Sequence, residues 1–147
     1  MAESGDRNDP YGAFNFTVEI DGVTVAGFSE ISGLNSETDV VEYRTGGEDI
    51  TNRKLPGLKK FANIVLKRGF TATDELWQWR KRVMDGETER QSGTIVLRNE
   101  ARDPAIKWVF REGWPSKWEG PAFNAKTSEV AIETLEIAHE GVEMELG

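Results

Sequence analysis

The stretch "FNFTVEIDGVTVAGF", residues 14–28, is the clearest structural signal in the chain. Apolar residues at every second position from Phe14 to Ile20 indicate a strand with one buried face. The following Asp21-Gly22 dipeptide is preferred in two-residue type I′ turns. The pattern therefore predicts a β-hairpin over residues 14–26. Thr17, Glu19 and Thr24 would share its polar face, because neighbouring side chains on a strand point to opposite sides.

Outward from this hairpin, most of the chain shows strand patterns. Further strands are predicted in 36–45, 58–69, 92–99, 105–112 and 128–146. In the last of these the apolar alternation slips twice, which suggests β-bulges, one of them near Gly141. Residues 113–121, "GWPSKWEGP", are rich in Pro and Gly and are expected to be irregular. The sequence thus predicts a mainly β domain.

One helix and one long loop interrupt these strands. Residues 73–85 place Leu76, Trp79 and Val83 on one stripe at helical spacing, which predicts a helix packed on a sheet. Residues 45–57 contain Gly46, Gly47, Pro56 and Gly57 and predict a long loop. Loops of this length inside a compact domain usually have a function.

Length and composition indicate how many domains the chain forms and whether disulfides stabilise it. The chain has 147 residues, no cysteine and a net charge of −8, so we expect one domain over residues 1–147 that folds without disulfides. Residues 1–10 are polar and are expected to form an extended arm rather than a signal peptide or membrane anchor. We therefore expect synthesis in the cytoplasm and no membrane insertion.

Charge is uneven along the chain: residues 1–52, 53–90 and 91–147 carry −9, +5 and −4. The basic middle segment is read either as a solvated surface or as one half of a head-to-tail attraction between identical copies, and the acidic balance disfavours binding to nucleic acid.

No pattern indicates catalysis, a cofactor or a metal. His139 is the only histidine, and "AHEG" lacks the second histidine of a zinc-binding HExxH helix. Glu37 and Asp39 would share one strand face and are read as solvated carboxylates. Gly46-Gly47 is not followed by the Lys-Ser or Lys-Thr of a phosphate-binding loop. We expect a protein that is not an enzyme.

Six fragments, in order, resemble the tail tube protein family of contractile phage tails and extracellular contractile injection systems. They are "FSEISGL" (28–34) with "EYRTGGE" (42–48), "LPG" (55–57), "NIVLKRG" (63–69), the helix with Leu76 and Trp79, "WPSKWEGP" (114–121) and "ETLEIAHEG" (133–141). The resemblance spans residues 10 to 146 and extends in fold to type VI secretion tube proteins.

The resemblance implies two packed antiparallel sheets that form a barrel or sandwich, one flanking helix and an extended loop. It implies homohexameric rings stacked into a hollow tube inside a contractile sheath, with baseplate or initiator and terminator proteins as further partners. Protein cargo or DNA would fill the lumen, and the tube would belong to a phage tail or a released particle.

Two groups of site residues follow from this resemblance, and a third group follows from the length of the loop over residues 45–57. Ser32 and Gly33 would form the turn at which the chain crosses between sheets. The polar residues Thr17, Glu19 and Thr24 would face the lumen. The loop residues expected to reach a neighbouring copy are Gly46, Gly47, Arg53, Lys54, Leu55, Pro56 and Gly57.

Two alternatives stay open. One is a tube-initiator or baseplate-hub relative in the same family. The other is a monomeric β-barrel module that stacks nucleic-acid bases on Trp108 or Phe110, although strand alternation places the flanking Lys107 and Arg111 on the opposite face.

Overall fold

The computed structural model describes residues 10–13, 15–21, 27–44, 46 and 53–146. This part of the chain contains strands β1 (Phe16–Ile20), β2 (Phe28–Ser32), β3 (Glu37–Tyr43), β4 (Arg53–Lys60) and β5 (Ile64–Gly69), helix α1 (Glu75–Met84), and strands β6 (Gln91–Arg98), β7 (Pro104–Glu119), β8 (Ile132–Ala138) and β9 (Gly141–Leu146). The second arm of the predicted hairpin lies outside the described residues.

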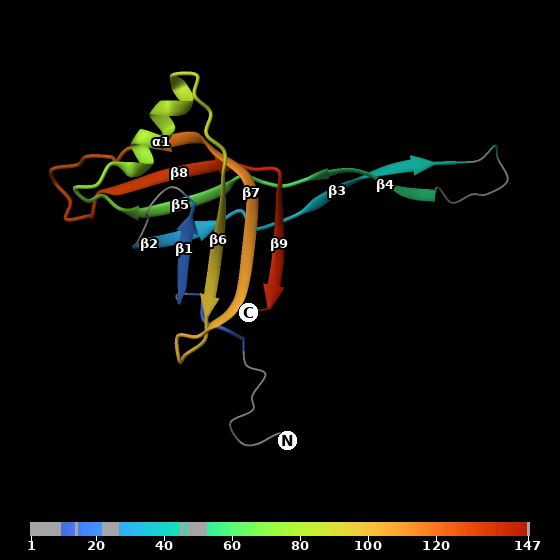
Figure 1. The fold of residues 1–147 in the computed structure, drawn as a ribbon, viewed down its shortest axis with the longest axis horizontal. Coiled ribbons are helices and arrows are strands. Elements are labelled where there is room, and N and C mark those ends of the chain that lie inside the picture. Colours follow the sequence, from blue (N-terminus) through green and yellow to red (C-terminus); the bar gives the residue numbers. More distant parts are fainter. Residues whose placement is uncertain (1–9, 14, 22–26, 45, 47–52, 147) are drawn as a thin grey trace, which may run out of the picture.

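The long strand β7 joins two antiparallel sheets. Its first part, residues 104–113, pairs with β6 and β9, and β6 pairs with β1; we call these four strands sheet A. Its last part, residues 114–119, pairs with β8, which is followed by β5 and β2; we call this group sheet B. In Figure 1 the strands of sheet A run vertically, those of sheet B run horizontally, and β7 bends from one direction into the other.

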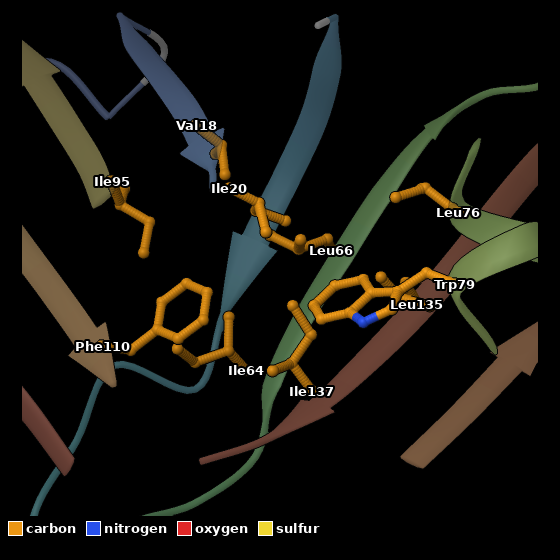
Figure 2. Packing of buried hydrophobic residues seen from close by; sticks show 10 residues of the cluster. All are labelled: Val18, Ile20, Ile64, Leu66, Leu76, Trp79, Ile95, Phe110, Leu135 and Ile137. Carbon is orange, nitrogen blue, oxygen red and sulfur yellow. The ribbon is translucent and has the colours of Figure 1, made fainter. Parts of the chain in front are cut away.

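The core lies where the two sheets cross. Its buried residues come from both sheets and from α1: Val18, Ile20, Ile64, Leu66, Leu76, Trp79, Ile95, Phe110, Leu135 and Ile137 (Figure 2). Phe110 is fully buried, and a Cβ atom at Gly93 or Gly113 would overlap its ring. These two glycines therefore leave the space that the largest strand residue of the core fills.

Helix α1 spans Glu75–Met84, within the predicted range 73–85. Its stripe is confirmed at Leu76 and Trp79, which are 1% and 0% exposed. The Trp79 indole Nε1 donates a hydrogen bond of 2.9 Å to the Glu89 carbonyl oxygen, which satisfies its buried polar atom. In the described part of the chain, no helix has the length and apolar character needed to span a bilayer.

The prediction of two packed antiparallel sheets with one helix is confirmed, but the barrel is not closed. Among the described residues the sheet path runs from β1 to β2, and these end strands do not pair with each other.

The prediction that residues 113–121 are irregular was wrong, because β7 continues to Glu119. Pro115 lies opposite Ile137 and next to a shift in register before Lys117, and irregularities of this kind are where a strand tolerates proline.

The slips in the apolar alternation of residues 128–146 come from a buried Glu133 and from a break between two strands, not from bulges. The predicted bulge near Gly141 is wrong: β8 ends at Ala138, and β9 begins at Gly141 in regular register with β7. The chain passes here from sheet B to sheet A. At the first slip, Glu133 takes the buried face of β8 between the exposed Ile132 and the buried Leu135.

Candidate assembly site

Strands β3 and β4 form a two-stranded ribbon that projects far from the two sheets (Figure 1). On one of its faces Val41 lies opposite Leu55 and Tyr43 lies opposite Arg53. The Val41, Tyr43 and Leu55 side chains are 49%, 50% and 46% exposed. This face therefore holds three large apolar side chains that the described chain leaves uncovered.

The other face of the ribbon also carries apolar residues. Val40 lies opposite Pro56, next to the Glu42 and Lys54 pair. Val40 is 62% exposed, and Leu58, beyond the bulge in the register, is 73% exposed. Soluble monomers rarely expose such a continuous apolar surface, so a projecting ribbon with two apolar faces indicates a contact surface.

The two strands of the ribbon carry charged side chains of opposite sign. β3 carries Glu37, Asp39 and Glu42, whereas β4 carries Arg53, Lys54, Lys59 and Lys60. Asp39 pairs with Lys60 at 3.0 Å, and this hydrogen bond raises the pKa of Lys60 above its ordinary value. Both side chains are exposed, so the pair contributes little to stability. Glu37 and Asp39, read from the sequence as solvated carboxylates, thus lie beside Lys60 on this ribbon.

The predicted loop over residues 45–57 was wrong for its second half. Arg53, Lys54, Leu55, Pro56 and Gly57 belong to β4, and Gly46 lies in a turn between the strands. Pro56 suits a ribbon because both strands of a pair are edge strands, where a missing N–H is tolerated. Gly57 fits because a Cβ atom there would come within 3.1 Å of the Asp39 carbonyl oxygen. Gly47 lies outside the described residues.

The predicted turn residues Ser32 and Gly33 lie where the chain leaves sheet B for the ribbon. Ser32 is the last residue of β2, and Gly33 has a φ of +95°. A Cβ atom at Gly33 would overlap the carbonyl oxygen of Asn63. Only glycine satisfies both the backbone angle and this close approach.

The predicted lumen residues Thr17 and Glu19 are exposed on β1, while Thr24 lies outside the described residues. Thr17 accepts a hydrogen bond of 3.3 Å from Nη2 of Arg98. Both side chains point away from the core, because Val18 and Ile20 between them are buried.

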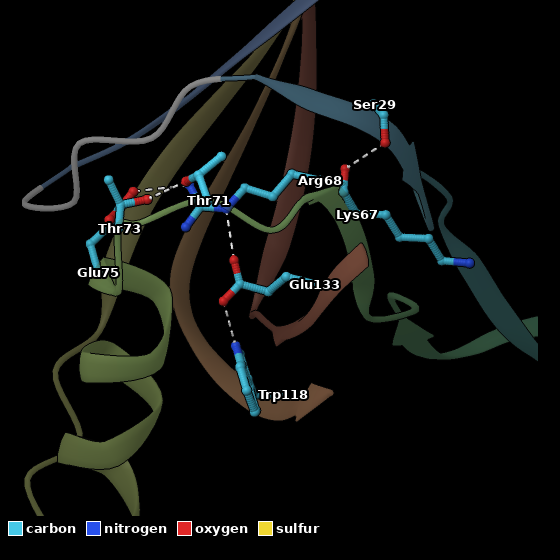
Figure 3. Close-up of polar contacts among 8 residues, drawn as sticks. All are labelled: Ser29, Lys67, Arg68, Thr71, Thr73, Glu75, Trp118 and Glu133. Carbon is cyan, nitrogen blue, oxygen red and sulfur yellow. Dashed lines mark hydrogen bonds and ion pairs between the residues drawn. The ribbon is translucent and has the colours of Figure 1, made fainter. Parts of the chain in front are cut away.

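The sequence analysis missed a buried ionic group that joins sheet B to α1 (Figure 3). Arg68 on β5 donates from Nε to Glu133 of β8 at 2.7 Å and from Nη1 to Glu75 of α1 at 2.9 Å. Trp118 Nε1 donates to the second Glu133 oxygen at 2.8 Å. Arg68 and Glu133 are 3% and 2% exposed, so each depends on the other to offset the cost of burying its charge. The slip in alternation at Glu133 was the signal for this group.

Glu75 is held in its charged form by this group. Burial alone would raise the pKa of Glu75, but hydrogen bonds from Arg68, the backbone and Thr73 outweigh burial and hold it below the ordinary value. The guanidinium of Arg68 also lies 5.8 Å from the Phe28 ring centre. One residue thus ties three strands of sheet B and the helix together.

The contacts of the single histidine and the setting of Phe110 bear on the alternatives weighed from the sequence. His139 is bound structurally: its Nδ1 accepts from the Gly141 N–H at 3.2 Å, and its Nε2 lies 2.9 Å from the Ala62 carbonyl oxygen. Within this part of the chain no three His, Asp or Glu side chains gather closely enough to hold a metal ion. Phe110 is fully buried and cannot stack on a base.

Comparison with solved structures gives close matches in fold. A chain of the cryo-EM structure of the anti-feeding prophage (AFP) baseplate shares 27% identity with a TM-score of 0.84, covering 95% of this chain and 97% of that chain. A chain of the sheath-tube complex of PVC, an extracellular contractile injection system, shares 26% identity with a TM-score of 0.86, covering 95% and 94%. A type six secretion system protein shares the fold at 14% identity, with a TM-score of 0.60 over 91% of this chain and 84% of that chain.

Comparison with curated proteins gave no match. The family described as T4-like virus tail tube protein gp19 matches residues 12–143, which include both sheets, the helix and the ribbon. Together with the fold, this match over nearly the whole chain shows that the chain belongs to the T4-like tail tube protein family.

Proposed function

We propose that this chain is the main subunit of the inner tube of a contractile injection system or phage tail. Copies form rings of six, and the rings stack into a hollow conduit for protein cargo or DNA inside a contractile sheath. Membership of the tail tube family and the likeness to the PVC sheath-tube chain support this proposal. The finished tube is part of a phage tail or of a particle released from the cell.

The observation that carries the proposal is the β3–β4 ribbon. Its two apolar faces are exposed in the single chain, and it extends beyond the body of the molecule where a neighbouring copy could be reached (Figure 1). Buried between copies, the apolar faces would contribute about 25 cal/mol for each Å² removed from water. Repetition around a ring and along a tube then stabilises the assembly although each contact is small.

The role is structural and involves no catalysis. What supports this is the arrangement of the titratable groups that the structure describes: the buried ones, Arg68 and Glu133, are engaged with each other, and His139 is bound to backbone groups. The subunit needs only to fold, to bind copies of itself and to leave a channel open.

The likeness to a chain of the AFP baseplate structure favours a second candidate, a tube initiator. An initiator would form one ring and stop, whereas the main subunit continues into tubes of many rings. Sheath, baseplate and terminator proteins are proposed partners for either role.

Electron microscopy of the purified chain separates these proposals. Rings and long tubes are expected for the main subunit, with a matching large species in light scattering. Single rings that lengthen only when another tube protein is added would identify an initiator. A chain that stays monomeric at high concentration, even with a tube initiator present, would overturn both.

A further inference from the structure

We infer that His139 fixes the direction of the β3–β4 ribbon and that its protonation releases the ribbon, so that assembly depends on the charge of this one side chain. The inference rests on the proposed tube, in which the ribbon contacts a neighbouring copy. It concerns the base of the ribbon, which we define as residues 33–36 and 61–63, where the chain enters and leaves the ribbon.

The direction of the ribbon depends on its base. Among the described residues β3 and β4 pair only with each other, so no ladder joins them to sheet A or sheet B. In Figure 1 they project from the body of the molecule as a long arm. A small rotation at the base of such an arm moves its far end by a large distance. Copies that are to contact one another identically therefore need a base that is held in one position.

Hydrogen bonds hold the two halves of the base together. The side-chain Oδ1 of Asn35 accepts from the Ala62 N–H at 3.2 Å, which joins the segment entering the ribbon to the segment leaving it. The Asn35 N–H in turn donates to the Gly33 carbonyl oxygen at 3.0 Å. The base is thus one hydrogen-bonded unit that includes Ala62.

His139 ties this unit to the joint between the two sheets. It lies between β8 of sheet B and β9 of sheet A, and its Nε2 is 2.9 Å from the Ala62 carbonyl oxygen. Its Nδ1 accepts a hydrogen bond of 3.2 Å from the N–H of the buried Gly141. The imidazole ring also lies near the Phe61 ring, with centres 5.8 Å apart. A side chain of the sheet joint thus contacts two residues of the ribbon base.

These contacts require a neutral ring with its proton on one particular nitrogen. Nδ1 can accept from Gly141 only if it carries a lone pair, so the proton of the neutral ring is on Nε2, where it is donated to Ala62. A second proton would turn Nδ1 into a donor that faces the Gly141 N–H. Two N–H groups cannot bond each other. Because the ring is held between its two partners, it cannot leave Gly141 without a change in distance or angle at Ala62.

His139 is also the group at this joint that responds to pH. It is the only histidine of the chain, and imidazole is the side chain that ordinarily changes charge between about pH 5 and 8. The ionisable groups that flank this point on the elements packed around it are Arg111 and Glu112 of β7, Glu140 between β8 and β9, and Glu37 and Lys60 of the ribbon. Arginine, lysine and carboxylate groups ordinarily keep their charge over this range. A response to pH that disappears when His139 is replaced therefore reports on this ring.

Distances between spin labels in the single chain test the release of the ribbon directly. Lys54→Cys places one label on β4 and Lys117→Cys places the other on sheet B, and the natural chain has no cysteine to interfere. The distance distribution is measured at about pH 8 and about pH 5.5, at a concentration too low for assembly. The control pair, Lys117→Cys with Glu143→Cys, joins sheet B to sheet A and does not include the ribbon.

Two changes at position 139 separate the roles of the ring nitrogens. In His139→Gln the amide nitrogen lies as many bonds from Cβ as Nε2 does and can donate to Ala62, but it does not ionise near neutral pH. In His139→Asn the side-chain oxygen lies as many bonds from Cβ as Nδ1 does and can accept from Gly141, but the side chain is too short to reach Ala62.

We expect the ribbon distance of the chain with His139 to be narrowly distributed at the higher pH and broadly at the lower, with the control pair unchanged. His139→Gln should be narrow at both pH values, and His139→Asn broad at both. Tubes of the natural chain should need a concentration about tenfold higher at the lower pH, as expected for about one hydrogen bond lost at each contact, and His139→Gln tubes should not.

A ribbon distance that does not respond to pH, or that responds equally in His139→Gln, would overturn the inference. A control pair that broadens together with the ribbon pair would also overturn it, because the whole chain would then be unfolding. If neither variant folds, the comparison of the two pH values in the chain with His139 still decides. Failure of the natural chain to form tubes at any pH would contradict the proposed function, whereas the spin-label distances test His139 in the single chain whether or not tubes form.

Discussion

Single residues fix two of the points at which this chain departs from regular strands. Gly33 sets the exit from sheet B, and Glu133 places a charge in the apolar face of β8. Gly33 adopts a positive φ that other residues rarely adopt, and Glu133 needs an ionic partner, Arg68, that is distant in the sequence.

The change Gly33→Ala should lower the free energy of unfolding by more than about 1 kcal/mol, because it adds an overlap with Asn63 to the strain of a positive φ. Gly86→Ala is the matched control. Gly86 has a φ of +90° but open space around it, so this change measures the backbone cost alone. Urea unfolding followed by tryptophan fluorescence compares the two. Equal losses would show that the contact with Asn63 adds nothing.

Glu75 should make part of the stability depend on pH. Its pKa in the folded chain lies below the ordinary value of 4.5, so the charged form is favoured by folding. Its contribution is therefore fully present above pH 4.5 and is lost as the pH falls through the lower pKa of the folded chain.

We expect Glu75→Gln to be less stable than the natural chain at neutral pH and to approach it in acid. Chemical unfolding at neutral pH and at several values below 4.5 measures this difference. Glu87→Gln, at an exposed position beyond α1, is the control for removal of a carboxylate. A difference that stays constant over the whole pH range would show that the ion pair with Arg68 does not favour the charged form.

At the scale of elements, local pattern was sufficient where one face is apolar and the chain is regular. The alternation around Val18 and the stripe of Leu76 and Trp79 identified β1 and α1. Pattern failed at Pro56 and Pro115, because proline weakens a strand prediction and only the finished fold shows that both lie at strand edges. The break between β8 and β9 could not be predicted from the local pattern either, because it depends on β8 joining sheet B and β9 joining sheet A.

The ribbon yields a prediction that separates assembly from folding. Replacing both Val41 and Leu55 by serine removes an exposed cross-strand pair, which should cost about 1 kcal/mol or less of monomer stability. The same change should abolish tubes, because it removes apolar contact area at every interface that the ribbon makes. Circular dichroism and electron microscopy on one preparation measure both effects.

Met84→Ser serves as the control for this ribbon variant. Met84 is 51% exposed, like Val41 and Leu55, but lies at the end of α1 rather than on the ribbon. Tubes should survive this change. Normal tube formation by the ribbon variant would show that the ribbon is not an assembly element.

At the scale of the whole molecule, exposed edges and net charge oppose each other. Among the described residues β9 pairs only with β7, and an edge of this kind invites pairing with another chain, while Glu143 and Glu145 on β9 and a charge of −8 per subunit resist it. This balance keeps copies of the chain separate until several contacts between copies form at the same time. Ring closure and ribbon contacts supply those contacts in the proposed tube.

This balance predicts that added salt promotes assembly. Unit charges interact over about 30 Å at 0.01 M salt but only about 8 Å at 0.15 M, so repulsion between acidic subunits weakens while apolar contacts do not. Light scattering during a salt titration should show tubes appearing as the ionic strength rises. A fall in assembly with salt would mean that head-to-tail attraction between the basic and acidic segments dominates instead.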